Sequence, residues 1–430
     1  MLSNFRIYFS CVILSVAAAA SAQSPPVSGR TELLRLSRAQ AIEESLARNP
    51  ALAAARAQVE QARAQVVVAG AIADPTLAFD VAGQSNAFRP GSGNGSDQGV
   101  GVTIPFPGKL GLRRAVATAE LRVAEFNLAQ LRQQIASQAA QSYDAILVAR
   151  RHREDLQQNK DLASDFVKKT QARFMAGTVA RVDVIKAQTD LAQAENDLIT
   201  NDRAIATARA SLNRVLGRMG GAPIETTDTL EVPGPIASIE TLERAAETSR
   251  PEIQSFAAQL EGARAAARLA REYWAPDISV SLTRNAPDGA ATTYTSAVGF
   301  GIPIFFRQHQ HGELAAARYR EEELTANLAD IRAQVGLDVQ TAYASASTAL
   351  RQAVFIRDQL LPQAREVYRV ASVSYGLGGS SALELLDAKR TLLAAESQYV
   401  DALGAANDAL AALQLSIGAP LPPATPGELP

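Results

Sequence analysis

Two stretches of the chain repeat one another and decide its architecture: NPALAAARAQVEQARA at residues 49–64 and RPEIQSFAAQLEGARA at residues 250–265. Their prolines, Pro50 and Pro251, are 201 residues apart. A period of this length indicates a duplicated half-molecule, because solenoid repeats span only about 20 to 50 residues. The same offset relates Pro75 to Pro276, Phe174 to Tyr375, Gly177 to Gly378, and Ala187 to Ala388.

Residues 1–22 have the pattern of a secretory signal peptide. Arg6 precedes an apolar run of about 14 residues, and residues 20–22 (ASA) supply the small side chains needed for cleavage before Gln23. A membrane anchor is the alternative, but spanning a bilayer takes about 20 apolar residues. The only cysteine, Cys11, lies inside this segment. We therefore expect a mature protein without a thiol, a disulfide or a lipid anchor.

The composition favours long helices and excludes several partners. The formal charge is −2, so no basic surface points to nucleic acid. Hydrophobic residues make up 47% of the chain but aromatic residues only 5%, so alanine, leucine and valine dominate, as in long helices. After the signal segment, no apolar run of about 18 residues predicts a transmembrane helix.

Each half is predicted to contain a helix, two strands, a very long helix and a medium helix. In the first half, a helix over 37–73 is interrupted at Pro50, and alternating residues then predict two strands around a glycine-rich loop. The residues on one side of these strands are Leu77, Phe79 and Val81, then Val100, Val102, Ile104 and Phe106. The second half repeats the helix over 238–274, with strand residues Ile278, Val280 and Leu282, a loop near Pro287, and Val298, Phe300, Ile302 and Ile304.

The long helix is predicted from Lys109 to about Phe174, since no proline occurs between Pro107 and Pro223. At 1.5 Å per residue it is about 100 Å long. The chain reverses at residues 176–178 and returns as a helix of about 55 Å. A seam of small and apolar residues predicts packing against other helices, with an ordinary helical bundle as the alternative. Its members are Leu121, Ala124, Leu128, Leu131, Ile135, Ser142, Ala145 and Ala149.

Strand counting favours a shared barrel. Each chain offers about four strands with one apolar face, whereas a closed barrel needs about eight or more. Three chains supply about twelve, an even number within the range of outer-membrane barrels. A soluble sandwich is the alternative, but helices of about 100 Å then have no partner of matching length. The predicted fold class is therefore α+β, mostly α, internally duplicated, with a long helical barrel and a β-barrel shared among three chains.

The chain resembles the TolC-type outer-membrane efflux proteins over nearly its whole mature length. The resemblance rests on the repeated stretches quoted above, on the strand-to-helix turn IPFPGKLGLRR at residues 104–114, and on the two reversals ARFMAGTVARVDVIKAQ and VSYGLGGSSALELLDAKRTLLAAE. It implies a homotrimer in the outer membrane of a Gram-negative bacterium, embedded in lipid, with a long periplasmic helical tunnel. The turn PFPGK at 105–109 is most similar to the CzcC and CusC branch, which serves heavy-metal exporters.

The resemblance implies the exit duct of a tripartite efflux system. Substrate passes from an inner-membrane pump of the RND type through a periplasmic adaptor into this channel, and heavy-metal cations of the cobalt-zinc-cadmium or copper type are the expected cargo. Multidrug efflux, type I protein secretion and, in another class, a periplasmic coiled-coil scaffold remain alternatives. The expected organisation is a signal peptide (1–22), a first repeat (23–220), a linker (221–237), a second repeat (238–418) and a proline-rich tail (419–430).

Glu384 and Asp387 are the candidates for the pore constriction. They are three residues apart just after a glycine turn, so both carboxylates project from one helix face. In a trimer they form two stacked acidic rings that attract cations. A solvated helix face is the alternative, but the resemblance places these two acids at the periplasmic constriction.

Closure of the entrance is assigned, through the same resemblance, to Tyr375, Asp183 and Arg173. Ser380 stands where the family has a basic residue, which removes one expected ion pair. The reversals are also expected to dock the adaptor. The docking residues are Phe174, Gly177, Thr178, Leu377 and Gly378, with Tyr375 beside them.

No cofactor or metal site is expected. His309 and His311 are two residues apart and could share one metal only in extended backbone, and no third ligand lies nearby in the sequence. No nucleophile elbow or phosphate loop occurs, so we expect no enzymatic activity.

Overall fold

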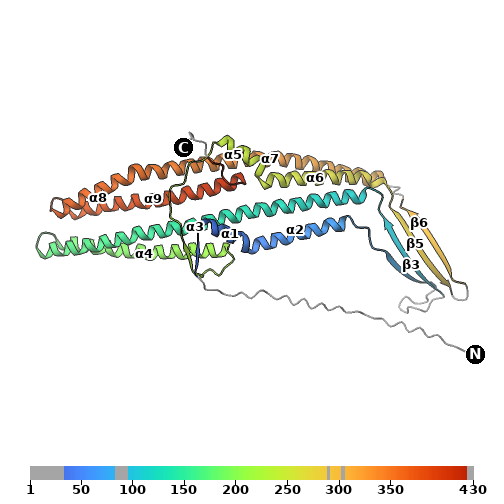
Figure 1. Cartoon of the computed structure of the whole chain (residues 1–430), viewed down its shortest axis with the longest axis horizontal. Coiled ribbons are helices and arrows are strands. Elements are labelled where there is room, and N and C mark those ends of the chain that lie inside the picture. Colours follow the sequence, from blue (N-terminus) through green and yellow to red (C-terminus); the bar gives the residue numbers. More distant parts are fainter. Residues whose placement is uncertain (1–32, 83–94, 288–290, 302–305, 424–430) are drawn as a thin grey trace, which may run out of the picture.

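The computed structural model describes residues 33–82, 95–287, 291–301 and 306–423. The predicted signal peptide, with Cys11, and most of the proline-rich tail lie outside the described residues. Helices run lengthwise along the molecule and a twisted sheet lies at one end (Figure 1). No helix in the described part of the chain is sufficiently long and apolar to span a lipid bilayer.

The first half follows the predicted order, with one strand before it. It consists of β1 (Leu34–Leu36), α1 (Arg38–Arg48), α2 (Pro50–Ala69), β2 (Thr76–Ala82), β3 (Gly95–Ile104), α3 (Lys109–Met175) and α4 (Arg181–Val215). Asn49 separates α1 from α2, because its side chain accepts from the Ala51 N–H at 2.9 Å and donates to the Val215 oxygen at 2.8 Å. Proline follows at the first helical position, where its missing N–H costs nothing.

The second half repeats this order. It consists of β4 (Ile224–Thr226), α5 (Ile239–Ser249), α6 (Pro251–Arg271), a 3-10 turn (Glu272–Trp274), β5 (Ile278–Pro287), β6 (Thr293–Phe300), α7 (Phe306–Phe355), a π turn (Ile356–Leu360), α8 (Leu361–Gly376) and α9 (Ala382–Ile417).

The long helix differs between the halves. α3 runs unbroken for 67 residues, as predicted, which is about 100 Å. Its counterpart is divided by the π turn, which directly precedes the Leu361-Pro362 start of α8. Proline has no N–H to donate to the turn before it, and a π turn accommodates that loss without ending the rod.

The four predicted strands form one antiparallel sheet in the order β2-β3-β5-β6. Its centre joins the halves, since Val100 of β3 pairs with Leu282 of β5. β5 ends at Pro287, next to which a loop was predicted, and β6 begins at Thr293, earlier than the alternation from Val298 indicated. Ile302 and Ile304 lie outside the described residues.

A second, parallel sheet pairs β1 with β4 and was not predicted. Tyr143 of α3 is fully buried beside it and donates its hydroxyl to the Leu36 oxygen at 2.9 Å. Its burial corrects the predicted seam, because Tyr143, Ile146 and Leu147 are buried whereas Ala145 is exposed. α3 packs against α4, α6 and α9, so several faces of one helix are covered at different heights.

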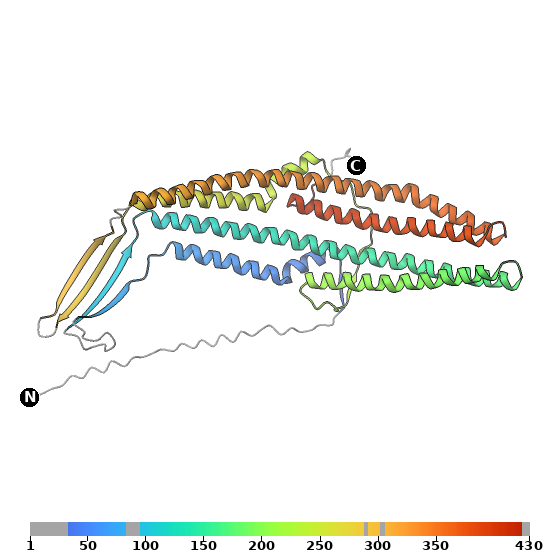
Figure 2. The same ribbon diagram turned by 180° about the vertical axis from the view of Figure 1, so that it is seen from behind.

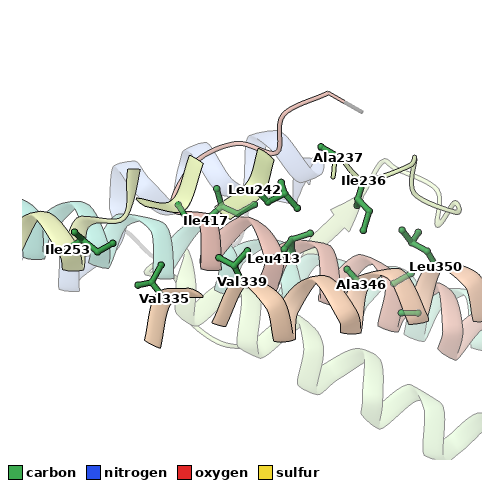
Figure 3. Packing of buried hydrophobic residues seen from close by; sticks show 13 residues of the cluster. Ile236, Ala237, Leu242, Ile253, Val335, Val339, Ala346, Leu350, Leu413 and Ile417 are labelled. Carbon is green, nitrogen blue, oxygen red and sulfur yellow. The ribbon is translucent and has the colours of Figure 1, made fainter. Parts of the chain in front are cut away.

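The largest apolar cluster holds the second half together. Leu242 of α5, Val339 of α7, and Leu413 and Ile417 of α9 are completely or almost completely buried and face one another (Figure 3). A smaller cluster joins β1, α1, α3 and α4 of the first half to β4 in the same way. Seen from behind, the two helical hairpins, α3–α4 and α8–α9, extend side by side to the end opposite the sheet (Figure 2).

Candidate functional site

The candidate site lies where the two helical hairpins reverse. α3 turns into α4 at Gly177 and α8 turns into α9 at Gly378, with φ of 72° and 83°. Only glycine adopts such values readily. In each turn the third residue past the helix donates back to the last helical turn, Thr178 N–H to the Arg173 oxygen at 2.9 Å and Gly379 N–H to the Ser374 oxygen at 2.8 Å. The duplicated sequence thus builds the same reversal twice.

Tyr375 joins the two reversals. Only 3% of its surface is exposed, so Tyr375 itself offers little surface to a docking partner. Its ring lies 5.5 Å from that of Phe166, and its hydroxyl lies 3.2 Å from the hydroxyl of Thr170. The tyrosine is therefore held in a pocket of the other hairpin, where its apolar ring and its hydroxyl both find partners.

Arg173 completes this arrangement. Its guanidinium carbon lies 4.6 Å from the centre of the Tyr375 ring, and its Nη1 donates to the Tyr375 backbone oxygen at 2.8 Å. Phe166, Thr170, Arg173 and Tyr375 are called the interhairpin contact below. Two of the three residues assigned to closure, Arg173 and Tyr375, are thus brought together.

Asp183 is the third closure residue. It is in the first turn of α4, where a carboxylate is favoured by the helix dipole, and is half-buried. Ser380 donates weakly to the Ala371 oxygen of its own hairpin at 3.4 Å.

A second link between the hairpins was missed. Lys389 of α9 is buried and its Nζ lies 2.7 Å from Asp190 Oδ2 of α4. A signal for it was present, because Leu385, Lys389 and Leu392 occupy successive positions of one apolar helix row. A lysine in such a row requires a buried acid as its partner.

Glu384 and Asp387 are both exposed on α9. Glu384 also caps its own helix: its carboxylate accepts from the Ser381 N–H, and its N–H donates to the Ser381 hydroxyl, both at 3.2 Å. Removing this carboxylate therefore weakens the helix start as well as any acidic ring.

The docking candidates form an exposed apolar end of the molecule. Leu377 is 85% exposed and Phe174 is 41% exposed. Met175 was not predicted but is 84% exposed beside them. The two glycines keep these side chains at the tip of each reversal.

An acidic groove of about 1480 Å³ lies between α3, α4 and α9, on the side of the reversals that is nearer to the sheet. Ala145 of α3 lines this groove. Because residues 143 and 145 are about 200° apart around a helix, the groove lies on the face of α3 opposite Tyr143 and the two-stranded sheet. Burial raises the pKa of Asp155 and Glu396, and the Asp155 carboxylate raises that of Glu396 further. His152 Nε2 lies 2.9 Å from Asp401 Oδ1 in the same groove.

Metal ligation gains no support from the described residues. Among them, no three histidine, aspartate, glutamate or cysteine side chains gather as a metal site. His309 and His311 lie in α7, where the backbone is helical rather than extended.

Comparison with known proteins connects this architecture to transport. The family model described as outer membrane efflux protein matches residues 41–218 and 242–419, once in each half. The cobalt-zinc-cadmium resistance protein CzcC of Cupriavidus metallidurans is 24% identical over 85% of this chain and 86% of that protein. The pyoverdine export outer membrane protein OpmQ of Pseudomonas aeruginosa is 25% identical over 88% and 82%. The solved structure of CusC superposes with a TM-score of 0.76 and 20% identity over 89% and 92%.

Proposed function

Because the chain belongs to the outer membrane efflux protein family, we propose that it is the outer-membrane duct of a tripartite efflux system that exports heavy-metal cations. An inner-membrane pump, of the RND type, delivers the cations through a periplasmic adaptor, and this chain conducts them passively. The similarity to the cobalt-zinc-cadmium resistance protein supports this cargo, and pyoverdine export is the second candidate because OpmQ is about equally similar.

The observation that carries the proposal is the end of the molecule opposite the sheet. Two glycine reversals, one interhairpin contact and two exposed acids lie within one short stretch of the hairpins. A duct needs a narrow, adjustable entrance at one end and a membrane pore at the other. The positions of the reversals and the sheet at opposite ends support that division (Figure 1).

Assembly from three copies is part of the proposal. Four strands cannot close a barrel, and β2 and β6 lie at the edges of the sheet. An open sheet edge is not tolerated in hydrocarbon, so the edges of neighbouring copies pair, giving about twelve strands. The helical hairpins then surround a periplasmic tunnel, with the acidic groove on its inner wall.

The residues take three roles in this duct. Glu384 and Asp387 form the acidic constriction, and Arg173 and Tyr375 hold the hairpins of each copy together, with Asp183 facing the same entrance. The adaptor docks on the exposed reversals. These docking residues are Phe174, Gly177, Thr178, Leu377 and Gly378.

Single-channel recording of the purified full chain in planar bilayers tests the proposal. We expect a small, cation-selective conductance that micromolar to millimolar Zn²⁺ or Co²⁺ reduces, because a divalent cation resides longer than K⁺ between two carboxylate rings. Glu384→Gln with Asp387→Asn keeps a side-chain acceptor for the helix cap while removing both charges, and should abolish the selectivity and the block. A conductance of equal selectivity in this variant contradicts the constriction. The absence of any conductance in both the wild type and an Arg173→Ala variant contradicts the duct.

A further inference from the structure

One buried polar atom of the acidic groove has no hydrogen-bond partner. Asn159 of α3 lines the groove, and only 6% of its surface is exposed. Its side-chain oxygen, Oδ1, is enclosed and accepts no hydrogen bond from any described residue. Asn201 of α4 lines the same groove but donates its Nδ2 to the Ala149 oxygen at 2.9 Å. Because a buried acceptor without a donor destabilises the fold, the Asn159 oxygen points to a ligand that donates to it.

Two carboxylates lie close to this oxygen. α3 and α9 run in opposite directions, side by side (Figure 1), and the 2.9 Å contact of His152 with Asp401 sets their relative height. Glu396 of α9 is therefore level with Asp155 of α3. Burial and the nearby Asp155 carboxylate both raise the pKa of Glu396, so these two acids are neighbours across the groove. Asn159 follows Asp155 by four residues, on the same face of α3.

α4 brings a third carboxylate to the same height. Lys160 Nζ of α3 lies 3.2 Å from Glu195 Oε1 of α4, and Arg153 Nε lies 3.0 Å from Asp202 Oδ1. Asp197 lies between these two contacts along α4 and lines the groove. Three helices thus supply hydrogen-bond acceptors at one level of the groove.

The positive charges near these acids lie outside the groove. Arg151 Nη2 is 3.3 Å from Asp155 Oδ1, and Arg365 Nη2 is 3.8 Å from Glu396 Oε1. Both arginines are exposed, and neither is among the residues that line the groove. Six acidic but only two basic described residues line it. The interior of the groove therefore favours a cation.

The lining also restricts the kind of cation. Among the described residues, no three acids gather closely enough to hold one metal ion. Between the acids the walls are apolar. The apolar lining residues include Val148, Ala149, Leu156, Ala204 and Leu393. A ligand that spans separate acids and also contacts apolar walls is an organic cation rather than a single ion.

We propose that the acidic groove binds an organic cation in which a primary ammonium group is attached to an apolar body. An ammonium has three N–H donors, which match Asn159 Oδ1 and the carboxylates of Asp155 and Glu396. The apolar body lies against Leu156 and Leu393, and Asp197 adds attraction without a contact of its own. One chain forms the whole site, so this inference goes beyond the proposed metal cargo and does not rest on it.

Fluorescence titration of the purified full-length protein with dansylcadaverine tests the site, because this probe joins an ammonium group to an apolar fluorophore. We expect a saturable rise in emission. Asp155→Asn and Glu396→Gln should each weaken binding about tenfold, since each removes a hydrogen bond between charged groups. Glu195→Gln is the matched control, because Glu195 carries the same charge at the same height but does not line the groove. Its affinity for the probe should stay the same.

Asn159→Leu separates a role in binding from a role in the fold. Leucine keeps the bulk of the side chain and leaves no buried acceptor without a donor. We therefore expect about tenfold weaker probe binding, together with an unchanged or higher unfolding temperature in the absence of the probe. A lower unfolding temperature with unchanged probe binding shows that the Asn159 oxygen serves the fold, and overturns the proposal.

Three other results overturn the proposal. The first is the absence of saturable binding to the wild type, or equal weakening by Glu195→Gln. The second is equal binding of dansylamide, which lacks the ammonium group, because the apolar walls alone then explain the signal. The third is displacement of the probe by MgCl₂ but not by NaCl of equal ionic strength, which assigns the groove to an inorganic cation. The conductance of the channel is measured separately, so none of these results decides whether the chain is a duct.

Discussion

Replacing Arg173 by alanine tests whether the interhairpin contact holds the tunnel entrance closed. The guanidinium lies 4.6 Å from the centre of the Tyr375 ring and donates to its backbone oxygen at 2.8 Å. A partly buried cation–π contact contributes about 1 kcal/mol. A hydrogen bond from a charged donor contributes about 2 kcal/mol. The variant therefore loses about 3 kcal/mol of attraction between the hairpins of each copy.

Because every 1.4 kcal/mol corresponds to a factor of ten, this loss shifts the equilibrium between closed and open hairpins about a hundredfold toward the open form. Single-channel recording measures the shift as a larger open fraction or a larger conductance. Tyr375→Phe removes only the hydroxyl contact with Thr170, so its effect should be about tenfold.

Arg181→Ala is the matched control for this experiment. Arg181 is an exposed arginine at the start of α4, next to the same reversal. Its removal changes the net charge of the tip by the same amount without touching Tyr375. If Arg173→Ala and Arg181→Ala increase the conductance equally, charge alone controls the entrance and the interhairpin contact does not. If Arg173→Ala leaves the conductance unchanged while the protein stays folded, the reasoning is refuted.

Three further predictions concern stability, measured by thermal unfolding. Lys389→Met leaves the Asp190 carboxylate partly buried without its partner at 2.7 Å and should cost about 3 kcal/mol, most of it recovered by adding Asp190→Asn. Gly404→Ala places a Cβ 2.8 Å from Val148 Cγ2 and should destabilise by about 1 kcal/mol net, whereas Val148→Ala in the same chain removes the clash. Burial raises the folded-state pKa of Glu396 above its ordinary value, so the stability of the protein falls as pH rises above 4.5 through that pKa. Glu396→Gln should therefore raise the unfolding temperature at neutral pH and flatten this pH dependence. An unchanged pH profile in the variant contradicts this prediction.

The sequence predicted the helices better than the faces that they bury. Helix ends depend on local signals, and the reversal at residues 176–178 located the end of α3 to within one residue. Burial depends on which helix lies alongside. The predicted seam contained Ala145, yet α3 is covered on the side of Tyr143 by the two-stranded sheet. That sheet has three residues in each strand, too few to show an alternating pattern.

The two halves share the residues that shape the backbone of the reversals but not the residues of the interhairpin contact. Where both halves need the same backbone conformation, they retain the same residue, as at Gly177 and Gly378, whose φ values differ by only about ten degrees. At the interhairpin contact they differ, because Arg173 corresponds to Ser374. The contact therefore exists once in each chain, between its own two hairpins.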